Sequence, residues 1–140
     1  MAIINRTKDV SEQKEGVELS INNTTTGVDY PIALIECPVV IADAKLAALG
    51  LSGTPTSTLK IQRFIAGAGN TTIAISGALT ISAYGTSGYL TYSLPASGSS
   101  LLQLQKGDML VATSGGANAA VVSQLMDVVI QKLQDVKTWY

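Results

Sequence analysis

The sequence predicts an all-β domain, a jelly-roll-like sandwich or a closed barrel, with an extended N-terminal arm. Short apolar or alternating runs follow one another at about ten-residue spacing, and each ends in glycine, serine, threonine, asparagine or proline. The 13 glycines and the frequent threonines argue against a helix bundle. Helices that alternate with strands, as a doubly wound α/β fold requires, are missing from the pattern.

The 140 residues suit one domain, which we divide into an N-terminal arm at residues 1–16 and a β domain at residues 17–140. The arm is mostly polar and rich in charge, and it shows no sustained strand or helix periodicity. We therefore predict an extended segment that Ile3 and Ile4 anchor on a neighbouring molecule. A disordered start is the alternative.

Two runs near the start of the β domain predict strands. Residues 17–21 alternate apolar and polar side chains, which is the period of a strand with one buried face. Residues 28–41 form a long β-branched run, but Pro31 and Pro38 each remove a backbone donor from the sheet ladder. The prolines place this run on a sheet edge or split it at bulges.

The best helix candidate is residues 42–51, ADAKLAALGL. The segment is rich in alanine, Leu46 and Leu49 have the spacing of one helix face, and Gly50 supplies a stop. We therefore predict a short helix here, with an irregular connection as the alternative.

The middle of the chain predicts short strands separated by turns. The clearest strand is residues 59–65, in which two sets of side chains alternate. Further strands are expected at residues 72–76, 78–83 and 90–94, with turns at residues 66–70 and 84–89; the strands at 72–76 and 78–83 are alternatively one strand bent at Gly77.

The stretch Leu101 to Thr113 predicts two strands joined by a tight connection. Leucines at 102 and 104 alternate with glutamines at 103 and 105, so one face is buried and the other is wet. Gly107-Asp108 then bends or reverses the chain, because glycine reaches positive φ and aspartate bonds to nearby backbone. The apolar run resumes at Met109.

The segment 121–140 combines two patterns. Apolar residues fall at helical spacing, whereas clustered valines and isoleucines favour a strand. We predict a central strand at residues 122–132, followed by a less regular tail. The pair Trp139-Tyr140 at the end should not stay in water, so we expect it to dock on the domain or on a neighbouring subunit.

The charge balance argues against two classes of partner. Nine basic and ten acidic residues nearly cancel, so no overall field attracts nucleic acid or an anionic membrane surface. The charges are also unevenly placed. A surface with few charges stays soluble if hydroxyl-bearing side chains cover it or if other subunits bury part of it. We expect a combination of both in the middle section. Between Cys37 and Gln105 the charged residues are only Asp43, Lys45, Lys60 and Arg63.

Catalysis is not expected, and no metal or cofactor is predicted. The chain has no histidine, so it lacks the imidazole ligands of a cupin-type metal site and the base of a Ser-His or Cys-His nucleophile. The spacing of Glu36 and Asp43, the only carboxylates between Tyr30 and Gln105, suggests no shared site. Cys37 is the single cysteine and is expected to be a small buried hydrophobe.

Three further patterns have ordinary structural explanations. Residues 67–69, Gly-Ala-Gly, lack the other residues of a phosphate-binding loop and predict a hairpin turn. Residues 106–108, Lys-Gly-Asp, resemble an integrin-recognition tripeptide, but a turn between strands explains them. A sugar-binding face is a further hypothesis, although such residues on β surfaces more often pack or face water; it would use Thr71, Thr72, Tyr84, Tyr89 and Tyr92.

Four segments in the last two thirds of the chain carry a resemblance to a known family. They are STLKIQRFIAGAGNTT, SAYGTSGYLTYSLPASGSSLLQLQKGDML, TSGGANAA and the closing LQDVKTWY. With these segments the chain resembles small virion structural proteins of tailed bacteriophages. Within that group it is most similar to the capsid decoration, or cement, proteins of marine and cyanobacterial phages.

The resemblance implies a jelly-roll-like domain, usually a homotrimer, on the outer face of an icosahedral capsid. There it would clamp adjacent major capsid protein subunits without catalysis. The charge-poor middle fits burial between identical subunits, and the arm fits weak contacts that gain strength by multivalency. No run has signal-peptide or membrane-span length, so we expect synthesis in the host cytoplasm without Sec export. The leading alternative function is a carbohydrate- or receptor-binding β module of a phage tail or fibre. A further alternative is another virion part, such as a head-fibre base.

Overall fold

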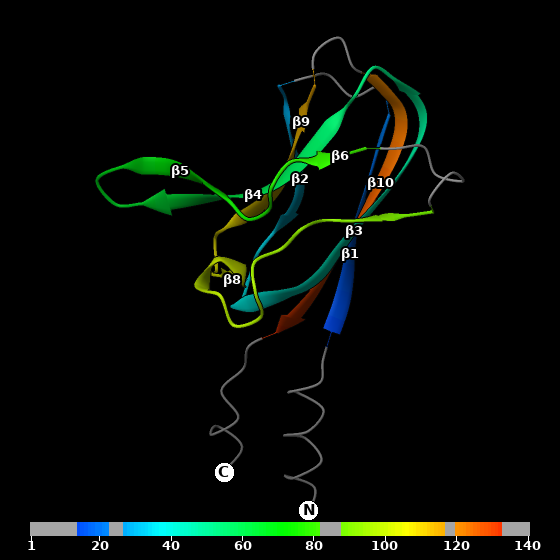
Figure 1. Cartoon of the computed structure of the whole chain (residues 1–140). Coiled ribbons are helices and arrows are strands. Elements are labelled where there is room, and N and C mark those ends of the chain that lie inside the picture. Colours follow the sequence, from blue (N-terminus) through cyan, green and yellow to red (C-terminus); the bar gives the residue numbers. More distant parts are fainter. Residues whose placement is uncertain (1–13, 23–26, 82–87, 117–119, 133–140) are drawn as a thin grey trace, which may run out of the picture.

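A computed structural model describes residues 14–22, 27–81, 88–116 and 120–132 of the chain. These residues form a two-layered β structure (Figure 1). Its elements are β1 (Lys14–Asn22), β2 (Asp29–Leu34), β3 (Val39–Ser52), β4 (Thr56–Ile65), β5 (Gly69–Ala74), β6 (Leu79–Thr80), β7 (Leu90–Thr91), the 3-10 helix η1 (Ser100–Leu102), β8 (Gln103–Leu104), β9 (Met109–Gly115) and β10 (Ala120–Lys132).

Strands that are distant in sequence pair with each other. β1 pairs with β10, β2 with β9, β3 with β7 and β8, and β4 with β5 and β6, and every pair is antiparallel. β10 also pairs with β3, which joins the first and third of these groups into one sheet. β9 also pairs with β4, which joins the second and fourth groups into the other sheet. The sheets have the orders β1-β10-β3-β7 and β2-β9-β4-β5. Two sheets with this strand order form a jelly-roll-like sandwich, so the predicted β fold is confirmed. The first 13 residues of the predicted N-terminal arm lie outside the described residues.

The core fills the space between the inner faces of the two sheets. Alternate strand residues point there, and Leu46 of β3, Leu59 of β4, Leu110 of β9 and Met126 of β10 are fully buried. Burial of apolar side chains of this kind is the main favourable contribution to folding. The short apolar runs of the sequence therefore become the interior of a sandwich.

Residues 42–51 form no helix but belong to β3, so the helix prediction is wrong. Leu46 is 1% exposed and Leu49 is 58% exposed. The two leucines therefore point to opposite faces of the sheet, whereas a helix would place them on one face. Pairing with β10 along nearly all of β3 outweighs the modest helix propensity of the alanines.

A β-bulge explains why this strand was hidden in the sequence. The register between β10 and β3 shifts between Val129 and Ile130, and Ala42 is left without a partner. Before the bulge Ile41 faces the core, and after it Ala44 does. An extra residue of this kind interrupts the period of two that identifies a strand.

The two strands predicted near the start of the domain are present. Residues 17–21 lie in β1, which begins at Lys14 and pairs with β10. The run 28–41 is divided between β2 and β3. β2 lies at a sheet edge and its register shifts between Pro31 and Ala33, as a proline in this run indicated.

The later strands are present, although several are shorter than predicted. β4 contains residues 59–65, and both β5 and β6 pair with it. β7 covers only Leu90–Thr91 of the predicted strand 90–94. The strand predicted at residues 122–132 lies in β10, which is central between β1 and β3. The predicted tail lies outside the described residues.

The tight connection between β8 and β9 is confirmed, but it does not close a hairpin. β8 pairs with β3 in one sheet, whereas β9 pairs with β2 and β4 in the other. Gly107 has a φ angle of 94°, and its N–H donates to the carbonyl of Ile35 over 2.8 Å. The bend therefore transfers the chain from one layer of the sandwich to the other.

Candidate interaction surfaces

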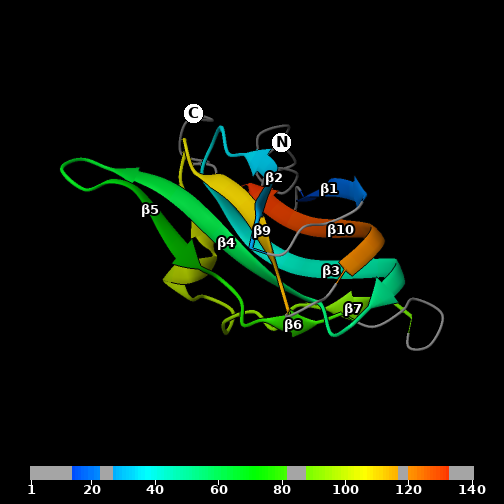
Figure 2. The same cartoon turned by 90° about the horizontal axis from the view of Figure 1, so that it is seen from above.

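The hairpin of β4 and β5 extends beyond the rest of the sandwich (Figure 2). β9 pairs with β4 as far as Gln62, which lies opposite Met109. β5 continues to pair with β4 as far as Ile65, which lies opposite Gly69. The end of β4 is thus flanked by one strand instead of two. We call residues 64–70 the hairpin tip.

A glycine turn closes this hairpin. The N–H of Ala68 donates to the carbonyl of Ile65 over 3.0 Å, and Gly67 and Gly69 have φ angles of 88° and 76°. Residues with a Cβ atom adopt such angles at a cost, so the two glycines define the turn. The predicted turn is confirmed but is shorter than residues 66–70, because β5 already begins at Gly69.

The hairpin tip presents apolar side chains to solvent. Phe64 is 72% exposed, and Ile65 beside it is also exposed. Since successive strand residues point to opposite faces, these two side chains lie on opposite faces of the hairpin. No residue from Phe64 to Asn70 carries a charge. Exposed apolar surface on a projection without charge is typical of a contact with another protein.

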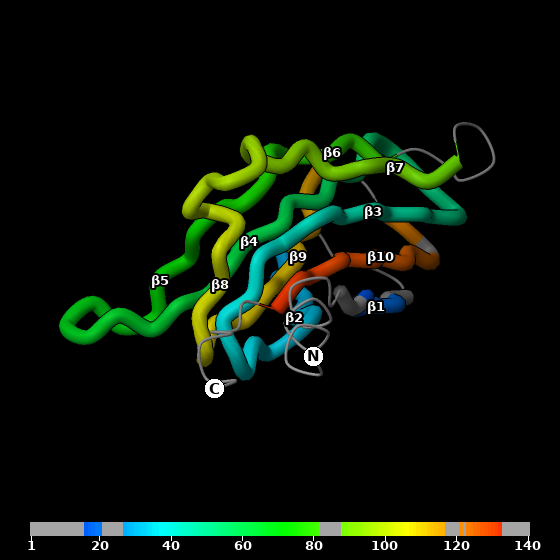
Figure 3. Tube along the Cα trace, turned by 90° about the horizontal axis from the view of Figure 1, so that it is seen from below, coloured from blue at the N-terminus to red at the C-terminus, as the bar shows by residue number. Residues whose placement is uncertain are grey.

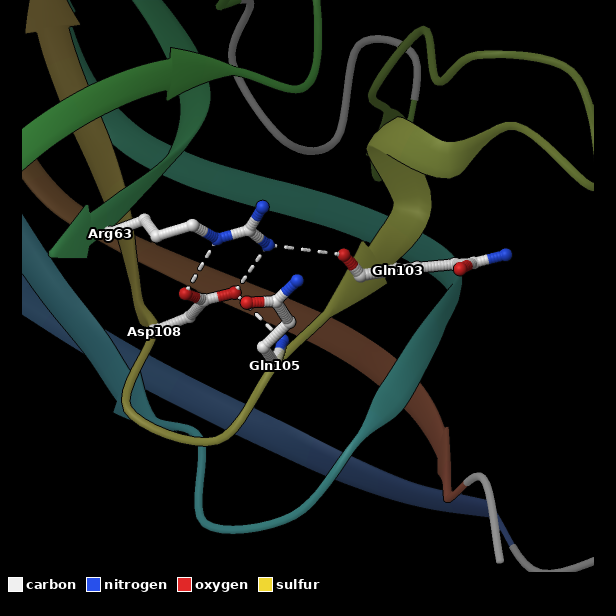
Figure 4. A network of polar contacts seen from close by, with 4 residues as sticks. All are labelled: Arg63, Gln103, Gln105 and Asp108. Atoms are coloured by element: carbon white, nitrogen blue, oxygen red, sulfur yellow. Dashed lines mark hydrogen bonds and ion pairs between the residues drawn. The ribbon is translucent and has the colours of Figure 1, made fainter. Parts of the chain in front are cut away.

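An ion pair fastens the base of the hairpin to the body (Figure 4). Arg63 donates from Nε to Oδ1 of Asp108 over 2.9 Å and from Nη2 to Oδ2 over 2.8 Å. Its Nη2 also donates to the Gln103 carbonyl at 3.5 Å, and the N–H of Gln105 donates to Asp108 over 2.7 Å. Two parallel hydrogen bonds between planar groups fix their orientation. We call this pair the Arg63–Asp108 clasp.

The carboxylate of Asp108 stays ionised although it is buried. Burial by itself raises its pKa, but hydrogen bonds from Arg63 and from the Gln105 N–H, together with the guanidinium charge, lower the pKa below its ordinary value of 3.8. The hydrogen bond to Asp108 in turn raises the pKa of Arg63. The carboxylate of the Lys-Gly-Asp tripeptide is therefore bonded inside the protein and does not face a receptor.

A second apolar surface lies on the outer face of β3 and β10. In the register, Ala47 lies opposite Leu125, and Leu49 lies opposite Ser123. Leu125 is 43% exposed, and two hollows of about 200 and 300 Å³ share Ala47 and Leu125 in their linings. We call Ala47, Leu49, Ser123 and Leu125 the β3–β10 groove.

Charged and aromatic side chains border one end of the groove. Lys45 lies opposite Asp127 in the register, and its Nζ is 3.3 Å from Oδ2 of Asp43 and 4.9 Å from the centre of the Tyr89 ring. The hydrogen bond with Asp43 is the main reason why the pKa of Lys45 is raised. This end of the groove is therefore charged, whereas three of the four residues that define the groove are apolar.

The contact residues that the sequence predicted lie outside the described residues; they are Ile3, Ile4, Trp139 and Tyr140. The strands that lead towards them are described. Lys14 of β1 pairs with Gln131 of β10, so residues 1–13 and 133–140 are attached at the same end of one sheet, at the bottom of Figure 1.

Sequence reasoning identified neither the hairpin tip nor the groove. Phe64 is the only phenylalanine and lies in the charge-poor stretch, which is a usable indication. Leu49 was assigned with Leu46 to a helix face, so its exposure on a strand was not foreseen. Nothing in the sequence indicates that Leu125 is exposed, because the exposure of its side chain depends on which other strands cover it.

Tyr89 and Tyr92, two of the tyrosines in the sugar-binding hypothesis, do not share a surface. Tyr92 is buried, and its hydroxyl lies 2.6 Å from the hydroxyl of Ser57 in the core. Burial raises the pKa of Tyr92 to about 12. Tyr89 is exposed beside Lys45, and Tyr84 lies outside the described residues. Tyr92 therefore links β4 to the β7 region inside the sandwich and is not available for stacking on a ligand.

Cys37 is partly buried and packs against the core, close to its prediction as a small buried hydrophobe. Within the described ranges no cluster of three or more Cys, Asp or Glu side chains is placed to hold a metal ion. In that same part of the chain no helix has the length and apolar character to cross a membrane.

No protein-family model matches the chain, and no curated protein matches it. Among solved structures, the chain is similar to one described as the structure of infectious bursal disease virus, Gx strain, with a TM-score of 0.38 and 12% sequence identity. The match covers 89% of this chain, which spans 38% of the length of the chain it matches. At this TM-score the likeness assigns neither a family nor a function.

Proposed function

We propose that this chain is a non-catalytic virion structural protein that decorates the outer surface of an icosahedral phage capsid. In this role it binds where major capsid protein subunits meet and clamps adjacent subunits together. It acts as a homotrimer on the capsid surface and uses no cofactor, nucleic acid or membrane.

The observation that supports this proposal most directly is the apolar surface of the described sandwich. Phe64 in the hairpin tip, and Leu49 and Leu125 in the groove, are large apolar side chains that face solvent. Exposed apolar patches mark surfaces that other proteins cover. A protein with two such surfaces on different sides is suited to a position among several subunits.

The fold and the sequence resemblance support the same role. Jelly rolls occur in viral capsid domains, lectins and cupins, so the fold alone does not choose among these functions. The lack of histidine argues against cupin-type metal chemistry, and the burial of Tyr92 argues against the tyrosine face of a lectin. The resemblance to phage decoration proteins favours the capsid role.

The terminal segments supply candidate contacts with the capsid. Ile3 and Ile4 lie in the arm, and Trp139 and Tyr140 lie in the tail. Since both segments are attached at the same end of one sheet, we propose that they bind one neighbouring surface together. When one of two linked segments is bound, the effective concentration of the other near its target rises, so two weak contacts together give strong binding.

The test is binding of the purified full chain to empty capsids of the phage that encodes it, prepared without the chain. We expect the chain to sediment with the capsids until saturation and to raise the temperature at which they rupture. Cryo-electron microscopy should show it on the outer surface. Failure to sediment with the capsids would contradict the proposal, and saturable binding to host polysaccharide would then favour the carbohydrate-binding alternative.

Two double variants test the terminal contacts. Ile3→Ser with Ile4→Ser, and Trp139→Ala with Tyr140→Ala, should each weaken capsid binding. Val28→Thr is the matched control, because Val28 is an exposed apolar residue of the sandwich and its replacement should leave capsid binding unchanged. Equal binding by all of these proteins would exclude the terminal segments as the clamp.

A further inference from the structure

We propose that the hairpin tip of one copy inserts Phe64 into the β3–β10 groove of the next copy, so that copies of the chain assemble head to tail. The proposal rests on the proposed function only in taking the chain as a self-associating virion protein. It assigns a residue to each side of the contact.

The tip and the groove of one copy are too far apart to meet. In Figures 1, 2 and 3 the turn between β4 and β5 lies at one extreme of the molecule, while β7 and the arched part of β3 and β10 lie at the other. The Arg63–Asp108 clasp holds the base of the hairpin against the turn before β9. The contact therefore requires a second copy.

The two surfaces agree in chemistry and in size. The tip is free of charge from Phe64 to Asn70, and the groove presents Ala47, Leu49 and Leu125. Its two hollows, of about 200 and 300 Å³, share Ala47 and Leu125 in their linings. An aromatic side chain fits a depression of this size, and its burial removes roughly 150–250 Å² from water.

The clasp prepares the tip for insertion. A two-stranded hairpin is only marginally stable in water by itself. Here the guanidinium of Arg63, directly before Phe64, is held in place because it donates two hydrogen bonds to the buried Asp108 carboxylate. A hairpin that is already ordered loses little conformational entropy when it binds.

Head-to-tail contact covers more apolar surface than a two-fold dimer in which two grooves face each other. If two grooves faced each other, both hairpin tips would remain exposed, whereas insertion of a tip into a groove covers both surfaces of every copy. Contacts between unlike surfaces form a ring where the rotation between copies closes. Each copy in a ring makes two contacts, so contacts that are individually small add up to a stable assembly.

The first test measures the solution mass of the full chain by light scattering over a range of concentrations. We expect the wild-type chain to reach the mass of a closed ring. Phe64→Ser and Leu125→Asp should each weaken association by about 30-fold or more, as hot-spot residues do. The matched control is Leu34→Ser on the edge strand β2, which removes another exposed apolar side chain and should leave the mass unchanged.

The second test cross-links two different chains, both carrying Cys37→Ser. A chain with Phe64→Cys and a chain with Leu125→Cys are mixed and oxidised, and a disulfide between them is expected. Phe64→Cys mixed with Leu34→Cys should give none. A disulfide between two Leu125→Cys chains would indicate grooves that face each other and would overturn the head-to-tail contact.

The remaining outcomes separate this inference from the proposed function. A wild-type chain that stays monomeric up to about 100 μM, or an assembly that Phe64→Ser leaves intact, overturns the contact. Loss of capsid binding with unchanged self-association in Phe64→Ser also overturns it, because the capsid protein then receives the tip. If Phe64 controls self-association but the wild-type chain does not bind empty capsids, the contact stands and the proposed function fails.

Discussion

The sandwich body and the β4–β5 hairpin share strand β4 but place its residues in opposite environments. Leu59 is 0% exposed, because β4 is flanked there by β9 and covered by the other sheet. Phe64, on the same strand, is 72% exposed, because β9 has ended and only β5 remains beside it. Strand formation and burial are thus decided by different features of the molecule.

The comparison shows what stabilises each region. The body depends on apolar area removed from water, whereas the hairpin depends on backbone pairing with β5 and on the Arg63–Asp108 clasp. An apolar residue in the body therefore contributes to folding. An apolar residue in the hairpin tip stays exposed and contributes little to folding.

The largest effect is expected from Leu59→Ala in the body. The change removes a fully buried side chain and should lower the free energy of unfolding by about 3 kcal/mol. Urea unfolding followed by circular dichroism measures it. A loss below about 1 kcal/mol would mean that the sheets do not pack as tightly at Leu59 as its burial indicates.

The next effect is expected at the clasp. Arg63→Met leaves the buried carboxylate of Asp108 without its cation and should destabilise the chain by about 2 kcal/mol. This is less than for a fully buried pair, because the Arg63 side chain is 23% exposed. The matched control is Lys45→Met, which breaks the exposed pair with Asp43 and should leave urea unfolding nearly unchanged. Equal effects of the two substitutions would contradict a special role for the clasp.

A smaller effect is expected when Asp108 is protonated. Because the pKa of Asp108 is lowered in the folded chain, the unfolded state binds more protons near pH 3 to 4. The contribution of Asp108 to stability is therefore complete above its ordinary pKa of 3.8 and is lost as the pH falls through the lower folded value. The free energy of unfolding, measured with urea at pH values from 5 to 2, should fall more steeply for the wild type than for Asp108→Asn. Parallel curves would show that Asp108 does not titrate differently in the two states.

The smallest effect on folding is expected at the hairpin tip. Phe64→Ser replaces an exposed side chain, so the free energy of unfolding of the monomer should change by less than about 0.5 kcal/mol. Urea unfolding at a concentration where the wild-type chain is monomeric isolates this quantity. A loss comparable to that of Leu59→Ala would show that Phe64 packs within its own chain.

Much of the fold followed from the sequence, and the exceptions have physical causes. Leucines at 102 and 104 were identified as buried because alternation with glutamine is a local signal. The segment 42–51 was misassigned because a bulge at Ala42 breaks the period of two, and because pairing with β10 is a contact between residues far apart in the chain. The two candidate surfaces were missed for the second reason.

Three properties of this protein follow from its amino-acid sequence: it is all-β, most of its strands can be located, and its middle section is poor in charge. These properties depend on backbone preferences and on the alternation of neighbouring side chains, which are local. The exposure of Phe64 and Leu125 and the burial of Asp108 against Arg63 become apparent only in the folded chain. Burial depends on where neighbouring strands end, and that is fixed by the wrapping of the whole ribbon.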